Sequence, residues 1–207
     1  EVLRRIADRH GRPDPFNWPG TDPAAESRFA GLVLHIISQQ ISTPVALTIF
    51  GRIRAASGGP PSPQDVLGLG PERMRHYGLS AAKTTSILQL ARRVDAGALD
   101  LQHLDDLDDD SVVTLLDRLP GIGRWTAEMF LIHQLHRPDV LPAADLAIRR
   151  GVQQSWRLPT APTEDHIRQL GHQWSPWRTY AAALLWASVS GPHRTPTAGL
   201  PVPTTQR

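Results

Sequence analysis

The stretch DRLPGIGRWTAEMFLIHQ, from Asp117 to Gln134, contains one proline and two glycines between two helical patterns. Pro120 cannot continue the first helix, because it lacks an N–H and clashes with the preceding turn. Gly121 and Gly123 have no Cβ and can adopt a positive φ, which suits a tight turn. The stretch therefore predicts two helices joined by a short hairpin, with both glycines free to take positive φ.

Such a hairpin predicts an anion site. The N–H groups of the turn and of the helix that follows Gly123 converge on one point, where the helix N-terminus carries partial positive charge. Arg124 adds charge at the flank. A DNA phosphate would be held there without its bases being read. A plain capping turn would use the same glycines, so PGIG alone leaves both interpretations open. The expected phosphate-binding residues are Gly121, Ile122, Gly123, Arg124 and Thr126.

Helical periodicity dominates the remaining sequence, and no run alternates as a strand would. Phe29, Leu32, Val33, Ile36 and Ile37 follow the spacing of a buried helix face. The chain is therefore expected to be all-α, with about ten helices. Further helices are expected after Ser42 or Thr43 and ending near Gly58, after Ser80, over Val112 to Leu119, from near Asp145, over Thr163 to His172, and over Trp177 to Ser190.

Composition narrows the class of protein. The 207 residues contain no cysteine, which excludes disulfides, thiol nucleophiles, Cys-ligated zinc and iron–sulfur clusters. The net charge is +2 and the pI about 9.6, although acidic residues concentrate in DDLDDD, Asp105 to Asp110. No apolar run approaches a membrane span, and the charged opening EVLRRIADRH predicts no signal peptide. We therefore expect a cytoplasmic chain without a membrane partner, associated with the nucleoid through DNA.

Four stretches together resemble the HhH-GPD DNA glycosylase superfamily, in its 3-methyladenine DNA glycosylase II (AlkA-like) branch. They are LPGIGRWTAEMFLI, IISQQISTPVA (Ile36 to Ala46), YGLSAAKTTSILQLA (Tyr77 to Ala91) and WSPWRTYAAALLW (Trp174 to Trp186). The resemblance implies a two-lobed helical domain over residues 1–192. It places the wedge loop in a lobe of about 24–110 and the hairpin and catalytic Asp within about 111–160. The Pro- and Thr-rich composition of residues 193–207 predicts a flexible tail.

The resemblance also implies the chemistry. The family places a catalytic Asp some twenty residues beyond its hairpin, and Asp145 in LPAADLAIRRG stands at about that distance. Its carboxylate would stabilise positive charge on the sugar and orient or deprotonate the attacking water. Bifunctional members carry a lysine where this chain has Trp125, so the resemblance implies a monofunctional hydrolase. A helix N-cap is the other interpretation of Asp145, and the two roles are compatible.

The expected substrate is an alkylated base of the 3-methyladenine type. Such a base is electron-poor and stacks on aromatic faces, which is worth about 0.5–2 kcal/mol per contact. The resemblance places Trp125 and Trp186 in the base pocket, where core packing is the alternative. Met129 and Ala187 stand where some relatives have aromatic residues, which predicts a more open pocket that admits 1-methyladenine or 3-methylcytosine. Phe16 and Trp18 are candidates for the opposite wall of the pocket.

To reach the bond, the enzyme must flip the nucleotide out of the duplex. The resemblance makes Gln40 the wedge that fills the gap, with Ile41 beside it, while Gln39 is expected to bond to backbone inside the protein. It further implies a structural Na⁺ or K⁺ at the hairpin and no required cofactor. The expected ligands are the carbonyls of Asp117, Leu119 and Ile122. His133 and His136 show no metal signature and are interpreted as surface or flank residues.

The expected partner is damaged double-stranded DNA, bound by a monomer. Three alternatives remain open at this stage: a non-catalytic helix–hairpin–helix module that only holds phosphates, a glycosylase for mismatched or oxidised bases, and a helical protein-interaction domain. The distance from the hairpin to Asp145 and the Trp-rich final helix disfavour the first. The hairpin glycines would be unexplained in the last.

Overall fold

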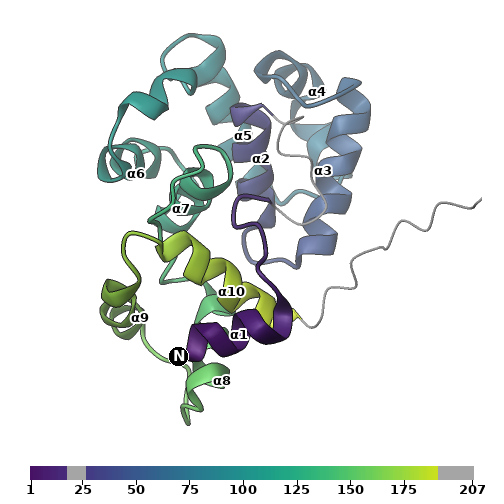
Figure 1. Cartoon of the computed structure of the whole chain (residues 1–207). Coiled ribbons are helices and arrows are strands. Elements are labelled where there is room, and N and C mark those ends of the chain that lie inside the picture. The colour runs from purple at the N-terminus through teal and green to yellow at the C-terminus, as the bar shows by residue number, and fades with distance from the viewer. Residues whose placement is uncertain (18–26, 191–207) are drawn as a thin grey trace, which may run out of the picture.

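The computed structural model describes residues 1–17 and 27–190, and Figure 1 shows the order of its elements. Those residues form helices and no strands, which confirms the all-α expectation. Trp18, the start of the expected first lobe and the expected tail over 193–207 lie outside the described residues. The elements are α1 (Val2–His10), α2 (Arg28–Ser38), α3 (Thr43–Ser57), α4 (Pro63–His76), α5 (Ala81–Asp95), η2 (Gln102–Asp106), α6 (Asp109–Asp117), α7 (Arg124–His133), α8 (Leu146–Trp156), α9 (Glu164–Gly171), η3 (His172–Trp174) and α10 (Arg178–Ser190).

Short polar side chains set where most helices begin. Ser27, Ser62, Ser80, Asp108 and Thr163 each stand one residue before a helix and accept a hydrogen bond from a backbone N–H of its first turn. Such caps satisfy donors that have no partner inside the helix. The helix starts expected after Ser80 and near Thr163 are confirmed.

Glycines set two of the boundaries. α3 ends at Gly58, which has φ 72° and donates its N–H to carbonyls of the last turn, as its place in the sequence predicts. α4 is interrupted at Gly70, where φ is 68° and ψ is 175°, and Pro71 restarts the helix. The α4 segment is therefore two short helices joined at a kink.

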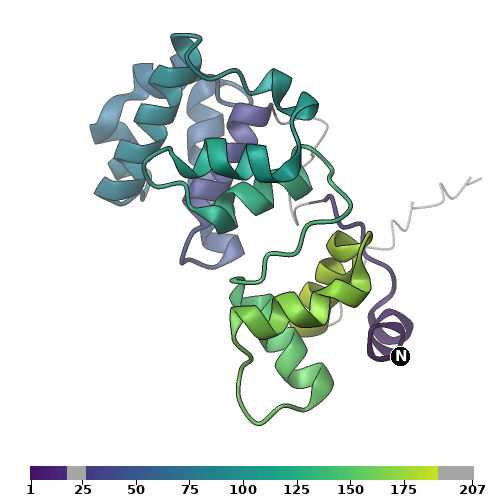
Figure 2. The same ribbon diagram turned by 90° about the vertical axis from the view of Figure 1, so that its left-hand side faces the viewer.

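Two hydrophobic cores hold the fold. The larger lies among α2 to α7 and runs in sequence from Phe29 to Val140; the smaller joins Ile6 of α1 to residues from Leu141 to Leu185. Figure 2 shows the corresponding two lobes. The hairpin belongs to the large lobe and Asp145 to the small one, although the sequence placed both in one segment, 111–160. Trp186 packs against both cores.

Candidate active site at the junction of the lobes

Asp145 is the N-cap of α8, where the chain enters the small lobe. Its Oδ1 accepts hydrogen bonds from the backbone N–H groups of Ala147 and Ile148, each at 2.9 Å. The expectation that a helix begins near Asp145 is confirmed. The cap fixes the orientation of the carboxylate, and the positive end of the helix favours its negative charge.

Two indole rings also donate to this carboxylate. Trp125 Nε1 donates to Oδ2 at 2.8 Å, and Trp186 Nε1 donates to Oδ1 at 3.1 Å. Oδ1 therefore accepts three hydrogen bonds and Oδ2 one, which leaves Oδ2 with acceptor capacity, since each oxygen has about two lone-pair sites. The family resemblance predicted that these residues lie together, but it did not show that both indole N–H groups donate to the carboxylate.

The ring beneath Trp186 belongs to His133. The two rings stack with centroids 6.1 Å apart and planes at 25°. His133 is 4% exposed, and burial lowers its pKa to about 4, so the imidazole is neutral at pH 7. The expectation that His133 is a surface or flank residue is wrong, because α7 buries the face that carries it. His136, after the end of α7, is exposed.

The remaining pocket candidates lie in different places. Met129 is 3% exposed and belongs to the large core, one turn after Trp125 on α7. Among the described residues, the ring neighbours of Phe16 are His136, at 5.2 Å between centroids, and Tyr180, at 5.7 Å. Phe16 thus packs by the start of α10 and not against the two indoles.

The hairpin needs its two glycines for different reasons. Gly121 has φ 79°, and a Cβ built there would lie 2.0 Å from Ser86 Oγ. Gly123 has φ −99° and ψ 176°, which any residue adopts, and a Cβ there would meet nothing within 4 Å. The expectation of positive φ is therefore confirmed for Gly121 and wrong for Gly123. Open space at Gly123 leaves the backbone approachable from outside.

Backbone donors gather just after that glycine. Gly123 caps α7 without a side chain, and the first bond of the helix runs from Ala127 N to Gly123 O at 3.1 Å. The N–H groups of Arg124, Trp125 and Thr126 therefore precede the helical ladder and have no acceptor inside the helix. Free donors at the positive end of a helix form an anion site.

The five expected phosphate-binding residues divide into two groups. Gly121, Gly123 and Arg124 are exposed. Ile122 is 3% exposed and its N–H donates to Leu119 O, so Ile122 faces the core. The Thr126 hydroxyl is also buried and accepts a hydrogen bond from Gln39. Only the backbone N–H of Thr126 remains for an outside anion.

Arg124 has a buried carboxylate beside it. Arg124 Nε donates to Glu128 Oε1 at 2.9 Å, with the arginine side chain 57% exposed and the glutamate 8%. Burial raises the pKa of Glu128 to about 7, which Arg124 and Arg168 partly oppose and Glu164 slightly reinforces. Sequence reasoning missed Glu128, whose i, i+4 spacing from Arg124 was the available signal.

Glu128→Gln should make the protein more stable than the wild type at pH 8. The difference in stability should be smaller at pH 5. A raised pKa in the folded state means that folding binds a proton, so this stabilising contribution is present below pH 4.5 and is lost as the pH rises through 7. The shift corresponds to about 3 kcal/mol at most. Thermal melting at both pH values measures the effect, with Glu72→Gln on the exposed face of α4 as control. Parallel pH profiles for Glu128→Gln and wild type would contradict the assignment.

The expected wedge loop joins α2 to α3. Gln40 is exposed with φ 57°, and Ile41 beside it is 37% exposed. Gln39 Nε2 donates to Gly121 O at 2.9 Å and to Thr126 Oγ1 at 2.8 Å, which confirms that Gln39 bonds inside the protein. The loop thus lies against the hairpin through Gln39, and the next residue, Gln40, is exposed.

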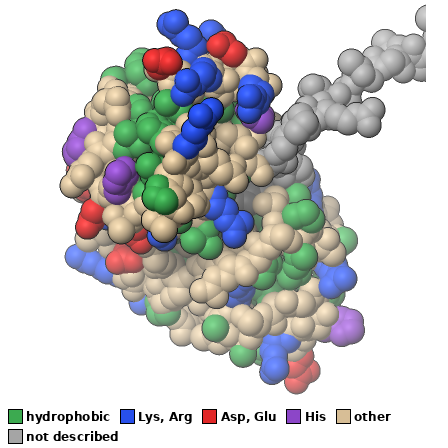
Figure 3. All heavy atoms as spheres, turned by 90° about the horizontal axis from the view of Figure 1, so that it is seen from below, with side chains coloured by type: hydrophobic (Ala, Val, Ile, Leu, Met, Phe, Trp, Pro, Cys, Tyr) green, Lys and Arg blue, Asp and Glu red, His purple; other side chains and the backbone are tan. Residues whose placement is uncertain are grey.

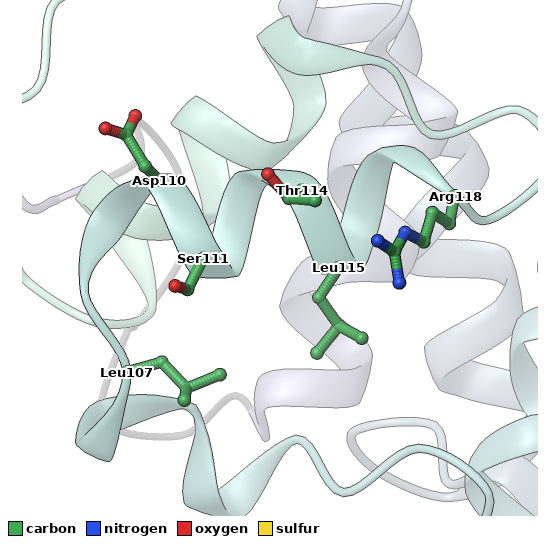
Figure 4. Close-up of a pocket in the computed structure, with 6 residues that line it drawn as sticks. All are labelled: Leu107, Asp110, Ser111, Thr114, Leu115 and Arg118. Carbon is green, nitrogen blue, oxygen red and sulfur yellow. The ribbon is translucent and has the colours of Figure 1, made fainter.

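One hollow in the surface of the described residues is lined by residues in and next to α6. It has a volume of about 390 Å³ and is open to solvent on the outer face of α6 (Figure 4). Asp145, Trp125 and Trp186 do not line it. Its lining residues are Leu107, Asp110, Ser111, Thr114, Leu115 and Arg118.

The described surface is mixed in charge. Figure 3 shows Lys and Arg side chains spread over one face of the molecule, several of them at its upper end beside acidic side chains. Because the net charge is only +2, affinity for a polyanion would depend on local sites such as the hairpin more than on an overall field. Residues 1–17 and 27–190 contain no cluster of three or more His, Asp or Glu suited to a metal ion, and none of their helices is long and apolar enough to cross a membrane.

Comparisons with known proteins all give matches to DNA repair proteins. Residues 33–176 match the model of the HhH-GPD superfamily of base excision DNA repair proteins. The chain is 34% identical over 171 residues to DNA-3-methyladenine glycosylase 1 of Schizosaccharomyces pombe, covering 81% of this chain and 75% of the relative. DNA-3-methyladenine glycosylase 2 of Escherichia coli is 26% identical, over 79% of this chain and 58% of its own length.

Solved structures agree with these sequence matches. The S. pombe 3-methyladenine DNA glycosylase in complex with abasic DNA superposes with a TM-score of 0.79 and 31% identity, covering 90% of each chain. A DNA-3-methyladenine glycosidase from Bacillus halodurans gives a TM-score of 0.72 and 28% identity, over 92% of this chain and 85% of that one. The chain belongs to the HhH-GPD superfamily of base excision DNA repair proteins.

Proposed function

We propose that this protein is a DNA glycosylase that flips an alkylated base out of damaged double-stranded DNA, hydrolyses its N-glycosidic bond and leaves an abasic site. The observation that carries the proposal is the Asp145 carboxylate, held by four N–H donors and with acceptor capacity left on Oδ2. The names of the relatives support the substrate class, since those of S. pombe and E. coli are DNA-3-methyladenine glycosylases.

Asp145 acts on the developing charge of the sugar. As the base departs, the sugar becomes oxocarbenium-like, and the carboxylate stabilises that cation. Oδ2 can also accept a proton from the attacking water. Because the helix cap and both indoles already hold the carboxylate, its orientation costs no rearrangement during the reaction.

The leaving base needs little help. Alkylation at N3 or N7 of a purine makes the base cationic, so it departs without a strong general acid, and an electron-poor ring stacks on aromatic faces. Trp125 and Trp186 are half-buried beside Asp145 and are suited to this contact. Met129 and Ala187 stand where some relatives have aromatic residues, and the missing rings favour a pocket open enough for 1-methyladenine or 3-methylcytosine.

The enzyme is proposed to be monofunctional. A lyase that works through a Schiff base needs an amine near the sugar. Lys83 is the only lysine in the sequence, and its Nζ donates to Ile37 O at 2.7 Å and Gln39 O at 2.6 Å. The hairpin position that would carry the nucleophile holds Trp125, whose N–H donates to Asp145.

A lesion panel tests the proposal. Purified protein is incubated with duplexes that each carry one defined lesion, and abasic sites are scored after alkali. Alkylated purines should be released, and strands should break only with alkali because no lyase acts. Binding without release from any duplex would favour the non-catalytic module. Release of oxidised or mismatched bases alone would reassign the substrate, and trapping of a borohydride-reduced DNA adduct would contradict the monofunctional mechanism.

Gln40→Ala should slow excision most where the lesion lies in a well-paired duplex. An exposed amide at the wedge position would fill the gap left by the flipped nucleotide, whose unstacking costs a few kcal/mol. Single-turnover excision is measured with one lesion opposite its normal partner, opposite a mismatch and in a single strand. The deficit should shrink along that series. An equal deficit on all three would remove Gln40 from the wedge role and direct attention to Ile41.

We further propose that the hairpin carbonyls of Asp117, Leu119 and Ile122 bind Na⁺ or K⁺. Backbone oxygens suit a hard cation, and Leu119 O, which accepts one hydrogen bond from Ile122 N, keeps a second lone pair. A bound cation would offset phosphate repulsion at these oxygens. No other cofactor enters the scheme. Replacing K⁺ and Na⁺ by a large organic cation at constant ionic strength should weaken DNA binding if the site exists.

A further inference from the structure

The loop that carries Gln40 is held from two directions. From one side, the Gln39 amide donates to Gly121 O and to Thr126 Oγ1, at 2.9 and 2.8 Å. Both acceptors belong to the hairpin, more than 80 residues away in sequence. A single side chain therefore ties the expected wedge loop to the expected phosphate site.

From the other side, Lys83 holds the same loop through its backbone. Lys83 lies in the first turn of α5 and donates from Nζ to Ile37 O and Gln39 O. These carbonyls stand at the end of α2, where orphan acceptors and the negative end of the helix attract a cation. The basic residues of this chain are otherwise arginines, so a compact ammonium occupies this one position.

Gln40 is the next residue, and its backbone conformation is unusual. It is exposed and has φ 57°, an uncommon backbone conformation for a residue other than glycine. A residue in this conformation persists when its surroundings determine it. Gln39 is restrained at its side chain by the hairpin and at its carbonyl by Lys83, so these restraints act on the bond that leads into Gln40.

We infer that Gln39 and Lys83 are positioning residues that fix the wedge in register with the hairpin. The inference rests on the proposed function, in which Gln40 fills the gap in the stack. A wedge on a loose loop would pay ordering entropy each time it entered the duplex. A wedge tied to the hairpin enters as soon as the hairpin holds the phosphate, because both belong to one rigid unit.

A double-mutant cycle with Gln39→Ala and Gln40→Ala tests this coupling. Gln39→Ala loses two hydrogen bonds of ordinary strength, which predicts roughly a tenfold fall in single-turnover excision from well-paired duplex. The fall should be smaller at a mismatch or in a single strand. If Gln39 acts through Gln40, the double variant should match Gln40→Ala within about twofold. Gln173→Ala is the matched control, because it removes a hydrogen bond that the side-chain amide of Gln173 in η3 donates to Leu170 O in α9.

The outcomes separate the inference from the function on which it rests. An equal Gln40→Ala deficit on all three substrates would overturn the wedge and this inference together. A substrate-dependent Gln40→Ala deficit with multiplying effects in the double variant would overturn the inference alone. So would a Gln39→Ala deficit equal on every substrate and accompanied by a lower melting temperature, which a merely structural contact predicts.

Lys83 has a test of its own. Lys83→Met keeps the apolar stem and removes the charge, so it should lower excision in the same substrate order as Gln39→Ala. Lys83→Arg restores a cation and should recover part of that loss. A lower melting temperature together with equal excision deficits on all substrates would show that Lys83 only caps the end of α2.

Discussion

Asp145→Asn should reduce single-turnover excision of an N3-methylated purine by about 10²–10⁴-fold, the range that a positioned acid–base group contributes. The charge that stabilises the sugar cation is lost. Affinity for the same duplex should remain, because the hairpin that we propose as the phosphate site is untouched. Excision and equilibrium binding, measured on one preparation, separate the two.

The geometry explains why asparagine is a suitable replacement for Asp145 in this test. Its amide oxygen can replace Oδ1 and keep the bonds from Ala147 and Ile148 that cap α8. Its NH₂ then faces Trp125 Nε1, donor against donor, where Oδ2 stood. The fold is therefore preserved while the reacting oxygen is removed. Wild-type excision in a variant with a normal melting temperature would overturn the catalytic assignment.

Gly121→Ala and Gly123→Ala should differ in their effects on protein stability. At Gly121 a methyl group clashes with Ser86 and φ is 79°, so strain and overpacking should cost roughly 2–4 kcal/mol of stability. For a domain of this size that corresponds to a melting temperature lower by roughly 5–15 °C. At Gly123 the backbone is unstrained and the space open, so the stability should change by about 1 kcal/mol or less.

For DNA binding the order should be reversed, with the larger loss of affinity in Gly123→Ala. A methyl group at Gly123 stands where a phosphate would approach the N–H groups of α7, so affinity should fall for damaged and undamaged duplex alike. The salt dependence should also become shallower if one phosphate contact is lost. Thermal melting and a salt titration of binding measure both properties. A stable Gly123→Ala variant with unchanged affinity at every salt concentration would argue against the phosphate site.

Local patterns predicted the helices well. The helix starts at Ser80 and Thr163 and the helix end at Gly58 depend on neighbours a few residues away, and the structure confirms them. The pairing of Asp145 with the hairpin and Trp186 came from the family resemblance, which carries spatial information that periodicity lacks. The hydrogen bonds of Trp125 and Trp186 to Asp145 show that these three residues lie together.

What escaped sequence reasoning depended on packing between distant elements. Positive φ is possible for any glycine, but only the folded backbone shows that Gly121 adopts it, at 79°, and that Gly123 does not, at −99°. His133 looked like a flank residue because nothing local shows that α7 is buried on that side. The Lys83 contacts with the end of α2 likewise join segments more than 40 residues apart.

The Asp145 carboxylate accepts hydrogen bonds from Trp125, which packs against the large core, and from Trp186, which packs against both cores. We therefore expect the rate of base release to depend on how the two cores fit together. A substitution deep in either core that tilts one lobe would change the electric field on Oδ2 without touching DNA. Since about 1.4 kcal/mol is a tenfold change in rate, buried positions far from the substrate become a route by which laboratory evolution can retune the speed of base release.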